Sequence, residues 1–246
     1  MNDHRVIDFQ SLRLHTNTQL LTDYGGFTHV KLRYGLLFCL SACVLTAAPV
    51  SIFGTGLDSN GQLLADGAVD THYQLLVSPS VQYPGPNAVV ADTQIHPVDN
   101  WISTGMTSKW ISIRFDAATF NPTGTYVYRT TFDLTGFDLS TVLLTGQFAT
   151  DDPGSILLNN VSTGINGCCY HQWTPFTISS GLVDGLNTLD FVVQNSGGGP
   201  TGIRVDLAGN GDLNAVPEPG SWILMSAGGV LLGLLTRSNR LRTLRS

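Results

Sequence analysis

Residues 126–134 read Tyr-Val-Tyr-Arg-Thr-Thr-Phe-Asp-Leu, and this stretch decides the fold. Its aromatic residues Tyr126, Tyr128 and Phe132, together with Thr130, fall on alternate positions. In a β-strand, alternate side chains point to the same face. Aromatic and β-branched residues also favour the pleated chain. The stretch therefore predicts a strand that buries one face in a core.

Eight further runs of the same kind flank this one, separated by turns rich in Gly, Asn, Asp and Pro. In the run 110–115, for example, Ile111, Ile113 and Phe115 share one face. No convincing amphipathic helix interrupts the series. The other expected strands are 73–77, 88–91, 141–148, 155–158, 174–178, 188–194 and 202–207. Nine short strands predict an all-β fold, a two-sheet antiparallel jelly-roll sandwich.

Motifs in the second half of this region add a resemblance. They are Tyr128-Arg129-x-x-Phe132, the turn Asp151-Asp152, the hairpin Asn159-Asn160, and Gly185-x-Asn187-x-Leu189. Over about residues 125–207 the chain resembles the galactose-binding-domain-like β-sandwich. The resemblance implies the fold and only weakly a function. Asn160 stands where that family usually has glycine, and the insert 161–173 is longer than a tight connection needs.

The C-terminal residues 216–246 combine three elements in a fixed order. Pro217-Glu218-Pro219 interrupts any preceding strand, because proline fixes φ and lacks an N–H. The apolar run 222–236 that follows is shorter than the roughly 20 residues that span a bilayer comfortably. Basic residues after such a run favour a cytoplasmic location for that end. They are Arg237, Arg240, Arg242 and Arg245.

This order resembles the PEP-CTERM sorting signal of Gram-negative surface proteins. The resemblance implies an exosortase-type sorting enzyme as partner and a single transmembrane helix that anchors the chain before processing. It also implies export through the inner membrane, with the processed protein at the cell surface or outside the cell. The alternative is an ordinary membrane anchor that stays in place.

The N-terminal region predicts export. Lys31 and Arg33 precede a short apolar stretch that ends in small residues, so residues 31–48 have the order of a signal peptide with cleavage after Ala48. Residues 40–43 also fit a lipoprotein box, in which Cys43 is lipidated. The polar residues 1–30 are either an extended leader or the product of an upstream start, and we expect them to lie outside the fold.

The remaining residues 49–215 form one predicted ectodomain, large enough for its own core. It has four basic residues and fourteen aspartates, so its net charge is −10. This charge argues against nucleic acid as a partner, since phosphate binding needs clustered Lys and Arg. No serine-hydrolase elbow, metalloprotease motif or distinguishable carboxylate pair is present. The sequence therefore predicts a non-catalytic surface protein, and the competing hypothesis is a glycan-degrading enzyme.

The adjacent residues Cys168 and Cys169 and three early aspartates are candidates for covalent or metal chemistry. In an oxidising compartment the cysteines can form a vicinal disulfide. Free thiols, an intermolecular bridge and a metal site are the alternatives, and we expect both cysteines in an exposed loop. Asp58, Asp66 and Asp70 supply hard oxygens suited to a structural Ca²⁺, or they form Asx turns. No other cofactor is indicated.

Polysaccharide binding is the most concrete activity that the sequence suggests. Tyr170, His171 and Trp173 place two aromatic rings beside polar groups within the long insert, a combination typical of shallow sugar sites. Asn195 and Trp101 are further candidates. The competing interpretation is that Trp173 closes one end of the sandwich, so that the ectodomain is purely structural.

Overall fold

The computed structural model describes residues 47–103, 105–214 and 228–230. Residues 47–214 contain eleven strands and one 3-10 turn, η1 (Val98–Asn100). The strands are β1 (Ala48–Pro49), β2 (Val69–Val77), β3 (Asn87–Val90), β4 (Ile111–Ser112), β5 (Gly124–Asp133), β6 (Leu143–Asp151), β7 (Gly154–Leu158), β8 (Val161–Gly167), β9 (Thr174–Ile178), β10 (Leu186–Asn195) and β11 (Gly202–Gly211).

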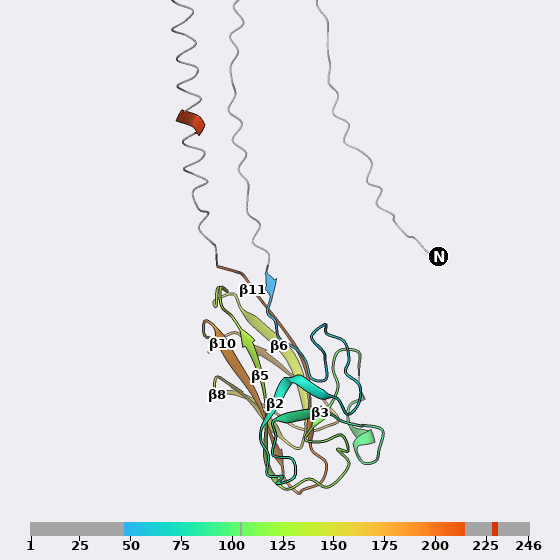
Figure 1. The fold of residues 1–246 in the computed structure, drawn as a ribbon. Coiled ribbons are helices and arrows are strands. Elements are labelled where there is room, and N and C mark those ends of the chain that lie inside the picture. Colours follow the sequence, from blue (N-terminus) through green and yellow to red (C-terminus); the bar gives the residue numbers. More distant parts are fainter. Residues whose placement is uncertain (1–46, 104, 215–227, 231–246) are drawn as a thin grey trace, which may run out of the picture. The chain divides into compact units, whose positions relative to one another are not determined.

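The strands form an antiparallel jelly-roll sandwich, as predicted (Figure 1). One layer has the order β8-β7-β10-β5-β2, and the other has β4-β11-β6-β9 with β1 on the edge of β11. The first half of β2 pairs with β3 and its second half with β5, with a bulge after Asp70. Strand β3 also pairs with β4, so the hydrogen-bonded path continues around this edge from one layer to the other.

The main core lies between the layers. Phe148 of β6 contacts Phe191 of β10 across it, with ring centroids 5.9 Å apart, and Phe176 of β9 lies 6.2 Å from the same ring. The predicted strand 126–134 is observed as β5, and its alternate residues 126, 128, 130 and 132 are all buried. Burial of large aromatic rings on one face is what stabilises this pairing of layers.

Two expectations about strands were wrong. The predicted strand 110–115 shrinks to β4, because only Ile111 and Ser112 pair with β3 and β11 before the chain turns away. Phe115, expected on the core face, is 44% exposed. Strand β8 was not predicted, since its mostly small polar residues lack apolar alternation. It forms because Asn159 and Asn160 adopt positive φ and fold it against β7, which confirms the predicted hairpin.

The chain enters and leaves the sandwich at the same place. Ala48 of β1 pairs with Gly211 of β11, and Pro49 pairs with Asn210 (Figure 1). Leu213 then forms an isolated bridge with Phe137. Both ends of the ectodomain are therefore held by the same strand.

The predicted extension, signal peptide, sorting motif and span lie outside the described residues, apart from residues 47, 48 and 228–230. In the part of the chain that the structure describes, no helix has the length and apolarity needed to cross a bilayer.

Candidate functional site

The outer surface of strands β6 and β11 carries a shallow groove. Antiparallel register places Gln147 beside Asp206 and Thr145 beside Ala208, and these residues face away from the main core. The loop that holds Met106 and Thr107 borders them. These six residues, with Leu57, Gly61, Gly146 and Leu207, line what we call the outer-face groove, an open depression of about 530 Å³.

A hydrogen-bonded carboxylate forms part of the groove lining. Thr107 Oγ1 donates to Asp206 Oδ1 over 2.9 Å, and Gln147 Nε2 donates to Oδ2 over 3.0 Å. Burial alone would raise the pKa of Asp206. Hydrogen bonds from Ser108, Gln147 and Thr107, with the nearby positive charge of Arg204, outweigh burial and lower that pKa below its usual value. Asp206 is therefore ionised at neutral pH.

Next to Asp206 along β11, Arg204 forms a stacked pair with Trp173. Arg204 is two positions before Asp206 on β11 and shares its face. Its guanidinium carbon lies 4.8 Å from the centroid of the Trp173 ring. Arg204 is 2% exposed, and its nitrogens donate to Ser108 Oγ and to the carbonyl oxygens of Ile102 and Ser103. Burial lowers its pKa, and Asp206 opposes that effect.

Beyond Arg204 the same outer surface supports a second, smaller core. Trp101 and Trp110 pack at a centroid distance of 4.3 Å, together with Val98 and with Ala149 of β6. Gly202 of β11 permits this approach, because an added Cβ would come within 3.1 Å of the Trp101 ring. The chain between β3 and β4 is thus folded back onto the sheet rather than extended into solvent.

The second core covers a carboxyl group. Trp101 Nε1 donates to Asp151 Oδ2 over 2.9 Å. Burial raises the pKa of Asp151 to about 7; the neighbouring carboxyl of Asp152 acts in the same direction, and the indole hydrogen bond opposes it. Asp152 itself accepts a hydrogen bond from the backbone N–H of Ser196. Because Asp151 is buried beneath a tryptophan, it does not face a substrate cleft.

The structure separates the residues predicted to bind sugar. Trp101 belongs to the second core and is 4% exposed, so its prediction as a binding residue was wrong. Asn195 is also buried, and its Nδ2 donates to the carbonyl oxygens of Asn121, Pro122 and Gly199. Tyr170 and Trp173 are half-buried against the second core. Only His171 is exposed, with its ring against the edge of Tyr170.

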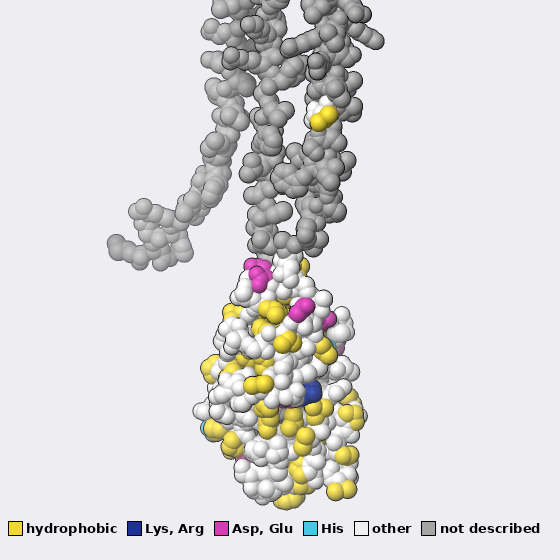
Figure 2. Space-filling model, turned by 90° about the vertical axis from the view of Figure 1, so that its left-hand side faces the viewer, with side chains coloured by type: hydrophobic (Ala, Val, Ile, Leu, Met, Phe, Trp, Pro, Cys, Tyr) yellow, Lys and Arg dark blue, Asp and Glu magenta, His cyan; other side chains and the backbone are white. Residues whose placement is uncertain are grey.

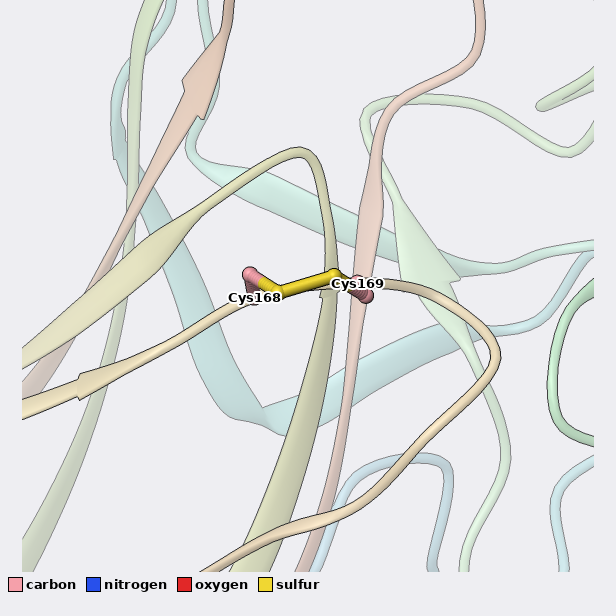
Figure 3. Close-up of a disulfide and its surroundings, with 2 residues drawn as sticks. All are labelled: Cys168 and Cys169. Carbon is pink, nitrogen blue, oxygen red and sulfur yellow. A yellow bond between two sulfur atoms is a disulfide. The ribbon is translucent and has the colours of Figure 1, made fainter.

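A disulfide joins Cys168 and Cys169 at the end of β8 (Figure 3). Both residues are half-buried, not exposed as expected. The reason is that the following loop folds back: the backbone N–H of Ile102 donates to the carbonyl of Tyr170 over 2.8 Å. The disulfide therefore lies next to the loop that carries Trp173.

The three aspartates predicted to bind calcium have separate protein partners. Asp58 accepts the backbone N–H groups of Asn60 and Gln62, which is the alternative Asx turn. Asp66 pairs with Lys109. Asp70 is buried and accepts the backbone N–H groups of Gly56 and His72. Burial raises its pKa. Among the described residues, no group of three or more His, Cys, Asp or Glu could hold a metal ion. Calcium binding stays a prediction without support from this geometry.

The sequence interpretation missed Gln147, Thr107 and Asp206. A signal for part of the site was present in strand 202–207, where Arg204 and Asp206 alternate with apolar residues and must face away from the core. The partners on β6 and on the loop could not be read from the sequence, because Gln147 and Asp206 are 59 positions apart.

Comparison with known proteins identifies the C-terminal segment. Residues 215–240 match the model of the PEP-CTERM protein-sorting motif. No curated protein sequence matches the chain. Among solved structures, a CBM35 from Paenibacillus barcinonensis is 16% identical, covering 55% of this chain and 92% of its own, with a TM-score of 0.29. A family 35 carbohydrate binding module from an environmental isolate is 15% identical, covering 52% and 88%, with a TM-score of 0.26. The chain thus carries a PEP-CTERM protein-sorting motif at its C-terminus.

Proposed function

We propose that this protein is exported, sorted to the cell surface by an exosortase-type enzyme that acts on residues 216–246, and binds an extracellular polysaccharide without cleaving it. The sorting motif supports the first two steps. The pairing of Pro49 with Asn210 supports the same route, since the ectodomain begins and ends at one place. A domain held in this way can fold while segments at both of its ends engage a membrane.

The observation that carries the binding function is the outer-face groove. It is shallow and open. A rigid pair of strands supplies a carboxylate, an amide and the Thr145 hydroxyl, and the neighbouring loop supplies the Thr107 hydroxyl. Side chains on paired strands keep a fixed spacing, so polar groups at one face can match the hydroxyls of a sugar ring. Trp173 is half-exposed, and one face of its ring packs on Arg204, the residue next to Asp206 on the outer face of β11.

The binding function is tested by polysaccharide pull-down with the purified protein. We expect Gln147→Ala to weaken retention about tenfold, because it removes one of the groove's polar contacts. Gln194→Ala is the matched control: this side chain is exposed on β10 and bonds to Thr125 instead. Circular dichroism verifies that both variants are folded. Equal loss in both variants, or no retention of the wild type by any polysaccharide, contradicts the proposal.

A purely structural surface protein is the second candidate, and one observation favours it. Trp173 covers a buried guanidinium, so the ring is explained by packing as well as by ligand binding. Under this hypothesis Trp173→Ala lowers stability and no polysaccharide is bound. The pull-down with folded wild-type protein therefore distinguishes the two functions.

A further inference from the structure

The outer-face groove presents a negative charge and has no basic residue in its lining. Its carboxylate, Asp206, is ionised because its hydrogen bonds and Arg204 lower its pKa. Arg204 itself is covered by Trp173 and donates to Ser108, Ile102 and Ser103. The positive charge of Arg204 stabilises the ionised form of Asp206, but Arg204 is buried and cannot contact a ligand.

The other basic side chains of the ectodomain are also engaged away from the groove. Lys109 pairs with Asp66, and Arg129 pairs with Asp190. Arg114 donates to the carbonyl of Phe120 and lies over Tyr83, beside a separate groove of about 380 Å³. On the face of the described residues that Figure 2 shows, only one basic side chain stands out. The net charge of −10 is therefore not offset near the outer-face groove.

The outer-face groove keeps several hydrogen-bond acceptors, besides the Thr145 hydroxyl and one amide hydrogen of Gln147 as donors. The Asp206 carboxylate receives hydrogen bonds from Thr107, Gln147 and Ser108, fewer than the roughly four that its two oxygens can accept, so at least one lone pair stays available. Gln147 uses its amide nitrogen on Asp206, so its amide oxygen can accept. Thr107 donates its hydroxyl hydrogen to the same carboxylate, so its oxygen can also accept. A complementary ligand must supply many donors and must not bring an anion close to Asp206.

Resting on the proposed function, we infer that the outer-face groove selects neutral, hydroxyl-rich polysaccharides and rejects polymers of acidic sugars. Neutral sugars offer hydroxyl donors to the acceptors of Asp206, Gln147 and Thr107. A carboxylate on the sugar meets like charge at short range, and the field of the whole ectodomain opposes the approach of a polyanion. Because no cation–anion contact is involved, affinity for the neutral polymer does not fall with added salt.

The test is affinity electrophoresis and calorimetry of the full chain in mild detergent. The neutral probes are dextran, galactomannan and laminarin; the acidic probes are alginate and polygalacturonate. Every titration is repeated in an Arg114→Ala background, so that the separate groove cannot supply acidic binding. We expect at least one neutral polymer to bind at least about tenfold more tightly than either acidic one. Its affinity should change little between about 50 and 500 mM salt, a range over which the Debye length falls roughly threefold.

Substitutions assign the selectivity to the groove. Asp206→Asn preserves the size of the side chain but removes its charge. We expect it to weaken the affinity for the neutral polymer about tenfold and to reduce the preference for neutral over acidic polymers. Gln147→Ala, which leaves Asp206 and Arg204 in place, is the second variant in case Asp206→Asn fails to fold. Gln194→Ala is the control and is expected to change neither affinity.

The outcomes separate the two levels of the proposal. Acidic polymers binding as tightly as neutral ones, with a ratio unchanged in Asp206→Asn, overturn the inferred selectivity but leave polysaccharide binding standing. Absence of binding to all five polymers overturns the proposed binding function and the inference together. Neutral binding that is lost in Gln147→Ala and kept in Gln194→Ala supports both.

Discussion

Asp151 is a buried carboxyl whose replacement by asparagine changes how stability depends on pH. In the folded protein its pKa is raised to about 7, mainly by burial beneath Trp101. In the unfolded chain an aspartate titrates near 4. Between these values the folded state holds a proton that the unfolded state has released. The free energy of unfolding therefore falls as the pH rises from about 4 to about 7, and is level above that.

The size of the effect follows from the separation of the two pKa values. About three pH units at about 1.4 kcal/mol each give about 4 kcal/mol as an upper bound for the loss across this range. An asparagine side chain cannot ionise, yet its amide oxygen can accept the Trp101 indole hydrogen. Asp151→Asn is thus expected to match the wild type near pH 4 and to exceed it by up to about 4 kcal/mol at pH 8. Asp70, whose pKa is also raised by burial, keeps a smaller slope of the same sign in the variant.

The assay is urea unfolding at pH 4, 5, 6, 7 and 8, followed by tryptophan fluorescence, to which the buried Trp101 and Trp110 contribute. The slope of free energy against urea reports the exposed area and should not differ between variants. Asp99→Asn is the matched control, since this aspartate is exposed beside His96. An unchanged pH profile in Asp151→Asn, or wild-type stability that rises between pH 4 and 7, refutes the reasoning.

Three further predictions concern the insert and the tail. Trp173→Ala uncovers the Arg204 guanidinium and is expected to lower the free energy of unfolding by about 2–3 kcal/mol, with Trp173→Phe losing less; chemical denaturation measures both. Reduction of the Cys168–Cys169 disulfide should shift the melting temperature by less than about 2 °C, because neighbouring residues close almost no chain; a large drop in calorimetry indicates a distant or intermolecular bridge. Replacing the tail arginines with serine removes the topology signal and should reduce the membrane-retained precursor in cell fractionation, with an unchanged level arguing against their role. These arginines are Arg237, Arg240, Arg242 and Arg245.

Local sequence patterns predicted the strands of the sandwich better than the contacts between distant parts of the chain. The alternation in 126–134 defined β5 and its buried face, because burial of one face imposes a period of two on the sequence. Strand β8 was missed because hairpin geometry, not hydrophobicity, holds it against β7. The sorting motif was predictable for a different reason. Its parts are contiguous in the sequence, and each is defined by its residue types and not by a tertiary contact.

The candidate site was less predictable, because it depends on contacts between distant parts of the chain. Trp101 was expected beside a ligand, yet the chain between β3 and β4 folds back and buries it on Gly202. Gln147 and Asp206 meet only through the register of β6 and β11. A loop tryptophan in a sequence does not reveal whether its ring meets solvent or a second core.

The central claim is that the chain is exported and processed at both ends, leaving the sandwich as the mature protein. Mass spectrometry of the surface-exposed or released protein tests it most directly, because it determines both termini in one measurement. The account predicts an N-terminus at Pro49 and the loss of all residues beyond Pro217-Glu218-Pro219. A surface protein that retains residues 220–246 contradicts processing by the sorting enzyme.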